Sequence, residues 1–352
     1  MIITRRAREK DVKDIIQLAD LIFRINNNLK PSMGIQFPFL LSEKNASNLL
    51  VAEDDGRIIS HVGIKIGKIL VNGCWIPIAS MGSVCTHPDY RRRNIAGTLV
   101  DQAMEMIQEK GVYLLTISGS LPLYTGRGAV FTGGIRKYFL NKENVSSTLS
   151  IDVSIEEIND ENISVFSALY QSENIRYERT KDEFTVLYRA YPMVATYPAN
   201  KAGLLARTHD GRPLAYVICH FNNDRCVITE YAGSRIAVNS IVKHILTRYT
   251  VNSVEIDINM YETEFIQLYR GIQSDERYCA CTYLIVNPQK FIDVIDPILK
   301  ERNYDKPLDE LMKDRSEFTH FVFDYYNRKD YGNMDGGVFP IPLPSPVGLN
   351  YI

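Results

Sequence analysis

Apolar positions in the first 140 residues follow two periods, and these periods predict a chain that alternates strands with helices. The clearest helical patterns lie at Asp11–Arg24 and Asn94–Lys110, and Cys74–Thr86 is predicted as a strand. An Asp55-Gly56 pair between two β-rich runs predicts a hairpin. Shorter strands or helical turns are expected at Ile2–Arg8, Ile64–Val71, Val112–Ser118, Leu121–Gly128 and Ile135–Leu140. This order favours a mixed sheet covered by helices.

The second half of the chain repeats the pattern. Leu204–Val217 resembles Leu49–Val62, because each predicts a strand, an Asp-Gly turn and a second strand. A strand at Cys226–Tyr231, a helix at Ile236–Tyr249 and a strand at Val254–Asn259 follow in the same order. We therefore predict an α/β protein with two similar domains in tandem. The expected units are a first domain (1–145), a mostly helical linker (146–200), a second domain (201–335) and an extended C-terminal tail (336–352).

Composition and charge narrow the class of protein. The 352 residues include 40 Lys+Arg and 42 Asp+Glu, and a net charge of −2 argues against a protein that coats nucleic acid. A hydrophobic content of 45% is enough for a packed core and excludes general disorder. No apolar run approaches the roughly 18 residues of a membrane span, and the N-terminus lacks the apolar segment of a signal peptide. The six cysteines have no metal-ligand spacing, so we expect reduced thiols, no metal and a cytoplasmic location.

The stretch from Met81 to Val100 carries the most informative chemistry. It predicts a strand that ends at Thr86, a turn, three consecutive arginines and a helix that starts near Asn94. The first turn of a helix has N–H groups without partners and the positive end of the helix dipole, so it suits an anion such as a phosphate. The residues alone leave a second interpretation open, namely a solvated run of charge ahead of an amphipathic helix.

This stretch resembles the acyl-CoA motif of the GCN5-related N-acetyltransferase (GNAT) superfamily, Arg/Gln-x-x-Gly-x-Gly/Ala. Arg91–Ala96 matches except at the fourth position, where Asn94 replaces Gly, and Asn adopts left-handed conformations more readily than most residues. The lead-in from Val84 and the element order over residues 1–140 also fit the family. The resemblance implies that acyl-CoA, with an acetyl or another short acyl group, contacts Val84, Thr86, Arg91, Arg92, Arg93, Asn94, Ile95, Ala96, Gly97 and Thr98.

The resemblance also implies how transfer proceeds. Backbone N–H groups from Arg92 to Thr98 would hold the pyrophosphate of CoA, and Val84 and Thr86 would pair with its pantetheine arm. An N–H near Val84 would polarise the thioester carbonyl. Tyr124 matches the position where the family often has a Tyr that protonates the leaving thiolate, and packing in the core is the alternative role for this ring. We name no side chain as the base for the attacking amine.

Two branches of the superfamily are similar to this chain. The tandem arrangement resembles the aminoglycoside acetyltransferases of the enhanced-intracellular-survival type, although the proton-donating Tyr of that group falls on Ala129 here. The N-acyltransferases of nucleotide-linked amino sugars have a similar size. The second half has no phosphate-binding motif around Ala232–Asn239. We therefore expect one CoA site per chain and a degenerate second domain that walls the acceptor pocket.

The C-terminal tail has an unusual composition for a solvated segment. Gly336–Ile352 has no charged side chain, and prolines occupy positions 340, 342, 344 and 346. Alternating proline keeps a chain extended. We predict that the tail lies in a groove between the domains, with its apolar residues buried: Phe339, Ile341, Leu343, Val347, Leu349 and Tyr351. It then either only joins the domains or, as the survival-type resemblance implies, also brings the carboxylate of Ile352 to the active site as a base.

Together these features predict a CoA-dependent N-acyltransferase that acts on the primary amine of a small molecule. An amino sugar is the favoured acceptor, nucleotide-linked first and aminoglycoside second. Five aromatic residues either pack in the core or contact the acceptor: Phe37, Phe39, Tyr188, Tyr191 and Tyr197. The alternatives are a non-catalytic acyl-CoA-binding regulatory module and a protein N-acetyltransferase. No nucleic-acid or membrane partner is expected, and a homo-oligomer is compatible with the sequence.

Overall fold

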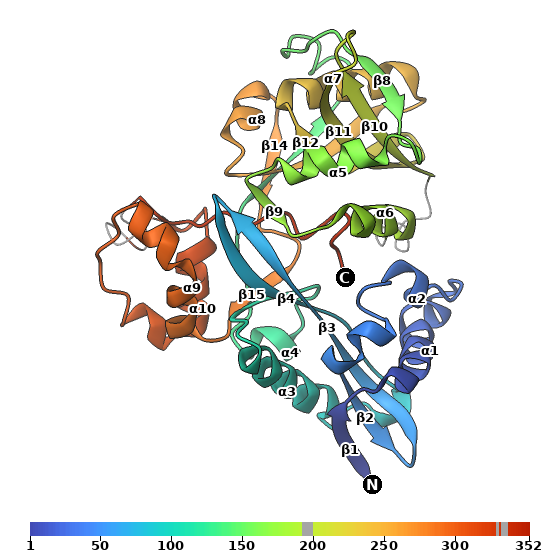
Figure 1. Ribbon diagram of the computed structural model, residues 1–352, viewed down its shortest axis with the longest axis vertical. Coiled ribbons are helices and arrows are strands. Elements are labelled where there is room, and N and C mark those ends of the chain that lie inside the picture. The colour runs from blue at the N-terminus through green and yellow to red at the C-terminus, as the bar shows by residue number, and fades with distance from the viewer. Residues whose placement is uncertain (192–199, 329–330, 332–336) are drawn as a thin grey trace.

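The computed structural model describes residues 1–191, 200–328, 331 and 337–352. Two mixed sheets lie one above the other in Figure 1, and helices cover faces of both. This is the predicted α/β fold with two similar domains in tandem. Tyr197 and Gly336, which the sequence placed in the linker and the tail, lie outside the described residues. Within the described part of the chain, no helix is long and apolar enough to cross a membrane.

The first sheet has the strand order β1-β2-β3-β4-β5-β15-β6. Its central strand β4 (Cys74–Thr86) is antiparallel to β3 (Arg57–Val71) and parallel to β5 (Leu114–Ile117). The amphipathic helices α1 (Val12–Phe23) and α3 (Ile95–Glu109) bury their apolar sides on opposite faces.

The other strands on or beside this sheet are β1 (Ile2–Arg6), β2 (Leu49–Asp54), β6 (Val130–Phe131), β9 (Ile175–Tyr177) and β15 (Thr282–Ile285). Short helices are α2 (Met33–Gln36) and α4 (Pro122–Thr125), with 3-10 turns at Glu9–Asp11, Ile25–Asn27, Glu43–Asn48 and Pro88–Tyr90.

The second sheet repeats this plan, with the order β14-β7-β13-β12-β11-β10-β8. Its strand β12 (Arg225–Gly233) leads into α7 (Arg235–Arg248) and then into the parallel strand β13 (Ser253–Asn259), as β4 leads into α3 and β5. Helix α7 covers one face, and α5 (Ile163–Gln171) and α6 (Lys181–Ala190) cover part of the other. The remaining elements are β7 (Ile135–Leu140), β8 (Ser154–Glu157), β10 (Asn200–Arg207), β11 (Pro213–Asn222), α8 (Thr263–Leu268) and β14 (Ser274–Arg277). The predicted helical linker therefore also supplies strands β8 and β9.

The two sheets exchange a strand. The strand β7, which the sequence placed in the first domain, pairs with β13 and β14 of the second sheet. In return β15, from the predicted second domain, inserts between β5 and β6 of the first sheet. The prediction that Ile135–Leu140 belongs to the first sheet was therefore wrong. Strand pairing across this distance depends on how the whole chain packs, and alternation along one strand does not specify its partner.

Two adjacent glycines allow this exchange. Gly133 has a φ of +76°, which L side chains rarely adopt, and a side chain there would lie 2.5 Å from the sulfur of Cys279. A side chain at Gly134 would lie 2.8 Å from both Met260 and Tyr325. The backbone of Met260 donates to the Gly134 carbonyl at 2.9 Å at the same point. The chain thus passes from one sheet to the other through a gap that is only wide enough for backbone.

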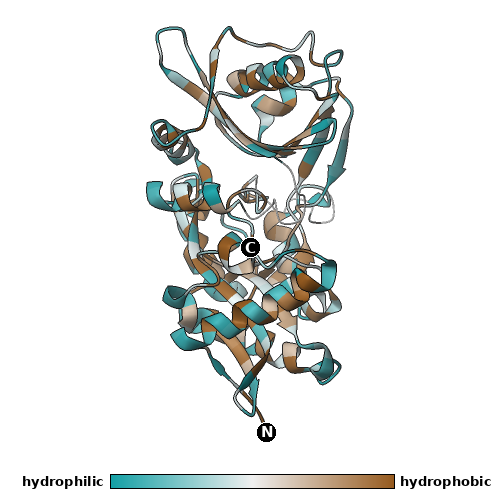
Figure 2. Cartoon of the chain, turned by 90° about the vertical axis from the view of Figure 1, so that its right-hand side faces the viewer, coloured by the Kyte–Doolittle hydropathy of each residue, from teal (hydrophilic) through white to brown (hydrophobic). Residues whose placement is uncertain are grey.

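The C-terminal region returns to the first sheet. Helix α9 (Pro288–Glu301) packs on strand β4, and α10 (Arg315–Phe323), which follows a 3-10 turn at Leu311–Lys313, packs on β15 and β6. The tail follows, and the Ile341 N–H donates to the Val322 carbonyl at 2.8 Å. The predicted burial holds for Phe339, Ile341, Leu343 and Leu349, whereas Val347 and Tyr351 are half-buried. Figures 1 and 2 show the C-terminus between the two sheets.

Candidate functional site

Strand β4 has a free edge beyond Met81. It pairs with β5 over Ile78–Met81 only, and the last contact is the Ser118 N–H to the Met81 carbonyl at 3.2 Å. On its other side β4 bulges, because Ser83 and Val84 together face one residue of β3, and Ser83 has a φ of +54°. Among the described residues, no strand pairs with β4 on its β5 side from Gly82 to Thr86. This leaves backbone groups available to an extended ligand, at the place where the sequence put Val84 and Thr86.

The free edge leads directly into residues Arg91–Thr98, which the sequence predicted to bind the phosphates of CoA and which are called the anion loop below. Arg91, Arg92, Arg93 and Asn94 are exposed, and Ile95 begins α3. Asn94 has a φ of +54°, so the position where the family motif has Gly is in the left-handed region, as expected for an Asn replacement. Its carbonyl accepts the Thr98 N–H at 3.1 Å, and no side chain caps the helix.

The first turn of α3 is therefore open to an anion. The N–H groups of Ile95, Ala96 and Gly97 have no acceptor within the helix, which is the general state of a first turn. A side chain at Gly97 would meet the amide oxygen of the exposed Asn94 side chain, which would have to move. Arg127 fixes the next turn, since it donates to Asp101 at 2.6 Å and to the Gly97 carbonyl at 3.2 Å. The loop brings together N–H donors, exposed arginines and the positive end of the helix dipole.

Tyr124 lies close to the free edge. It is 6% exposed, and its ring edge lies 3.0 Å from the position of a side chain at Gly119. Burial, together with the nearby Cys85 thiol of β4, raises the pKa of Tyr124 to about 12. The phenol is therefore neutral at physiological pH. Ala129, five residues later, is buried and offers no titratable group.

The C-terminus also reaches β4. A side chain at Gly82 would lie 2.8 Å from the carboxyl carbon of Ile352 and 3.0 Å from its oxygen. The sequence predicted a role for Ile352 but not this contact. A glycine inside a strand often marks a close approach of another backbone, and that signal was present in the sequence. The structure thus places Tyr124 and Ile352 beside the same short segment, Gly82–Cys85.

A buried ion pair holds the end of the tail. Glu230 accepts both guanidinium nitrogens of Arg179 at 3.0 Å, the Tyr216 hydroxyl at 2.8 Å and the Leu349 N–H at 3.4 Å. The Arg179 side chain is only 1% exposed. Sequence reasoning missed this pair, because its members lie 51 residues apart. Leu349 is fully buried and lies three residues before the C-terminus, so the pair limits where Ile352 can lie.

His61 of β3 is buried on the same face of the sheet as Gly82. Its Nε2 lies 3.2 Å from the position of a side chain at Gly63, the residue opposite Gly82. Burial lowers the pKa of His61 to about 3, so the ring is neutral. The other histidine of this region, His87, contacts Arg57 at 2.8 Å in the turn after β4. Neither ring lies among the residues that the sequence assigned to the site.

The equivalent of the anion loop in the second domain is filled by carboxylates. Arg235, the first residue of α7, pairs with Glu173 at 2.8 Å and with Glu262 at 2.7 Å. Glu173 also accepts the Gly233 N–H at 2.7 Å, just before the helix begins. An anionic phosphate at this position would meet two carboxylates. This gives a physical reason for the expectation of one CoA site per chain.

Two cavities lie between the sheets. The inner cavity, of about 80 Å³, adjoins the C-terminus and is lined by Phe39, Ser80, Tyr177, Leu349, Asn350 and Ile352 among others. Of the aromatic candidates for acceptor contact, Phe39 lies here, whereas Phe37 is in the core and Tyr191 is buried against His220 and Thr229. The cavity against the second sheet (the second-sheet cavity) is larger, about 490 Å³, and charged, polar, aromatic and aliphatic side chains all line it. Within the described residues, no cluster of side chains could hold a metal ion.

Comparison with known proteins agrees with this arrangement. Residues 4–131 match the family model described as an acetyltransferase (GNAT) domain. No curated protein sequence matches the chain significantly. Similar solved structures include a probable N-acyltransferase from Enterococcus faecalis V583 (TM-score 0.65, 15% identity, 83% of this chain and 74% of that one). Others are a GCN5-related N-acetyltransferase from Anabaena variabilis (0.64, 16%, 82% and 74%) and Eis1 from Mycobacterium abscessus (0.63, 15%, 84% and 76%).

At these identities the structural matches show the fold, whereas the family match covers the residues that form the free edge and the anion loop. Residues 4–131 of this chain therefore match the acetyltransferase (GNAT) domain family, and the chain as a whole has the fold of these solved structures, with two similar domains in tandem.

Proposed function

We propose that the chain is an acyl-CoA-dependent N-acyltransferase that transfers an acetyl or short acyl group to the primary amine of an amino sugar. One observation carries the proposal: the free edge of β4 runs directly into the Arg91–Thr98 loop. A thioester paired along Val84 and Thr86 would therefore have its pyrophosphate at the first turn of α3. The GNAT family match over residues 4–131 supports acyl-CoA as the co-substrate.

The Ile352 carboxylate is the base that we assign to the amine. In the reaction the amine nitrogen attacks the thioester carbonyl carbon, and that nitrogen becomes positively charged and strongly acidic. A carboxylate can accept a proton from such a nitrogen. The contact of Ile352 with Gly82 places this carboxylate beside the β4 bulge. An N–H of the bulge near Val84 would stabilise the oxyanion that forms.

Tyr124 acts on the leaving group. As the C–S bond breaks, negative charge develops on the sulfur of CoA. An alkyl thiol has a pKa of about 8.5, whereas the pKa of Tyr124 is raised to about 12. The phenol is then the weaker acid, so it stabilises the thiolate by donating a hydrogen bond, and water supplies the proton. This differs from the proton transfer that the family resemblance implied.

The test measures thiol release from acetyl-CoA and short acyl-CoA with a panel of amines that includes glucosamine and UDP-glucosamine. Tyr124→Phe should lower kcat about tenfold, the loss expected for one hydrogen bond of about 1.4 kcal/mol to a charged group, with an unchanged Kd for CoA. An unchanged kcat would remove Tyr124 from the mechanism. CoA binding without turnover of any amine would contradict the enzyme and favour the regulatory-module alternative.

A further inference from the structure

The tail ends in a turn that its own backbone closes. The Tyr351 N–H donates to the Gly348 carbonyl at 3.3 Å, so Leu349 and Asn350 form the corner of the turn. Gly348 has a φ of +104°, which L side chains rarely adopt, and a side chain there would lie 2.9 Å from the Thr229 carbonyl of β12. The turn therefore lies directly against the second sheet, and the C-terminal residue follows it.

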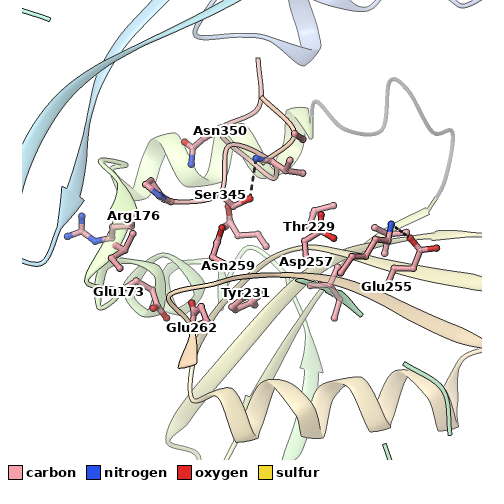
Figure 3. A pocket seen from close by; sticks show the side chains of 18 of the residues that line it. Glu173, Arg176, Thr229, Tyr231, Glu255, Asp257, Asn259, Glu262, Ser345 and Asn350 are labelled. Carbon is pink, nitrogen blue, oxygen red and sulfur yellow. Dashed lines mark hydrogen bonds and ion pairs between the residues drawn. The ribbon is translucent and has the colours of Figure 1, made fainter. Parts of the chain in front are cut away.

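The second domain holds both corner residues of this turn. Glu230 of β12 accepts the Leu349 N–H at 3.4 Å, and the Leu349 side chain is buried in the apolar cluster between the second sheet, α5 and α6. The Asn350 amide donates to the Tyr170 hydroxyl of α5 at 3.4 Å. Figure 3 shows the Asn350 side chain on the tail, above the strand that carries Thr229. One hydrogen bond at each corner thus fixes the turn to the second domain.

Buried neighbours fix the two groups that hold the turn. The Arg179 guanidinium donates to both carboxylate oxygens of Glu230 at 3.0 Å and lies 4.0 Å from the centre of the Tyr170 ring. The Tyr216 hydroxyl donates to Glu230 at 2.8 Å, and the Tyr170 hydroxyl accepts the Tyr177 N–H at 3.0 Å. The side chains of Arg179 and Glu230 are only 1% and 9% exposed. Neither holding group can move without breaking several buried contacts.

The turn directs the end of the chain onto the first sheet. Tyr351 and Ile352 pack against the apolar cluster that α1 buries on that sheet, and the carboxyl carbon of Ile352 lies against Gly82. Only Tyr351 separates the corner residue Asn350 from Ile352. A shift of the corner is therefore carried to the carboxylate with little slack, and the second domain limits where this group lies on the first sheet.

We propose that Tyr170 and Glu230 are positioning residues, which hold the Ile352 carboxylate at Gly82 so that it accepts the proton of the attacking amine. The inference rests on the proposed function, which makes that carboxylate the base. It gives the second domain a direct part in kcat, beyond the shape of the acceptor pocket. CoA binding does not depend on these residues, because the anion loop belongs to the first domain.

A double-mutant cycle separates positioning from a general effect on the fold. Tyr170→Phe keeps the ring and removes the hydroxyl that accepts the Asn350 amide. It should lower kcat about fivefold, as expected for one hydrogen bond, and leave the Kd of CoA within twofold of the parent. In a chain that lacks Ile352, where the base is already lost, the same substitution should change the residual rate by less than twofold. Equal losses in the two chains would overturn the proposal, because the hydroxyl would then act independently of the carboxylate.

Two further variants test the other contacts of the turn. Asn350→Ala removes the other partner of the same hydrogen bond, so it should reproduce the loss in Tyr170→Phe, and the double variant should lose no more than either alone. Glu230→Gln should lower kcat about tenfold in the parent and less than twofold without Ile352. If Glu230→Gln does not fold, the first two variants decide the proposal, and additive losses in their double variant would overturn it.

The matched control is Tyr249→Phe, which removes another hydroxyl of the second domain. That hydroxyl donates to Glu157 at 2.9 Å instead of contacting the tail, so kcat should stay within twofold of the parent. Deletion of Ile352 by itself separates the two levels of the argument. An unchanged kcat after the deletion would overturn the base of the proposed function together with its positioning. A loss after the deletion with an unchanged kcat in Tyr170→Phe would overturn the positioning alone.

Discussion

The contact between Gly82 and Ile352 gives a sharp test of the terminal carboxylate. Gly82→Ala places a methyl group 2.8 Å from the carboxyl carbon of Ile352, whereas ordinary contacts of a Cβ begin at 3.4 Å. The end of the tail must therefore move by at least about 0.6 Å, the difference between these distances. Gly82 has a backbone conformation that alanine also adopts, because its φ lies outside the left-handed region. The substitution thus acts through the tail.

The magnitude follows from the geometry of proton transfer. A misplacement of about 1 Å at a reacting group can lower the rate about 10²-fold. For a shift of at least 0.6 Å we expect kcat to fall about 10- to 100-fold, which corresponds to about 1.4–2.7 kcal/mol. The Kd for CoA should stay within twofold, because the substitution leaves the Arg91–Thr98 loop and the first turn of α3 unchanged.

The assay measures kcat by thiol release, the Kd of CoA by calorimetry and the melting temperature of each variant. Gly67→Ala is the matched control, since Gly67 lies on the neighbouring strand and lines the inner cavity, yet a side chain there meets nothing within 4 Å. It should keep the kcat of the parent. A folded Gly82→Ala variant with a kcat within twofold of the parent would refute the role of Ile352 and leave the tail as a connection between domains.

Two further predictions concern buried charge. Burial lowers the pKa of His61 to about 3, so below about pH 6.5 the unfolded chain binds a proton that the folded chain does not. The buried neutral ring therefore costs the protein no stability above about pH 6.5. As the pH falls below this value the free energy of unfolding decreases, by about 3 kcal/mol at pH 4. Urea unfolding of His61→Leu should show a smaller acid loss than the parent, and equal losses would contradict the assignment. Glu230→Gln leaves the Arg179 guanidinium buried without its carboxylate, so its unfolding free energy should fall by about 3–5 kcal/mol. The exposed control Glu264→Gln should change it little, and similar midpoints for the two variants would show that the pair does not anchor the tail.

Local features of the site were predictable from the sequence because they depend on neighbouring residues. The bounds of β4 agree with the predicted Cys74–Thr86 strand, and α3 begins one residue from the predicted start. The left-handed Asn94 follows from the preference of that residue type and from its place before a helix. The repeated order of strand, turn, strand, strand and helix was likewise visible in both halves. The burial of the tail followed from its lack of charge.

Contacts between distant segments were decided only by the tertiary structure. Alternation marked Ile135–Leu140 as a strand, but it could not show that this strand pairs with the second sheet while Thr282–Ile285 enters the first. The approach of Ile352 to Gly82, and the pair that anchors it, join residues separated by 270 and 51 positions. The sequence by itself determined the elements and the acyl-CoA loop, because local conformation and periodicity encode them. Which strands pair, which charges meet and where the tail ends depend on the packing of the whole chain, because each such contact requires many distant residues to be in place at once.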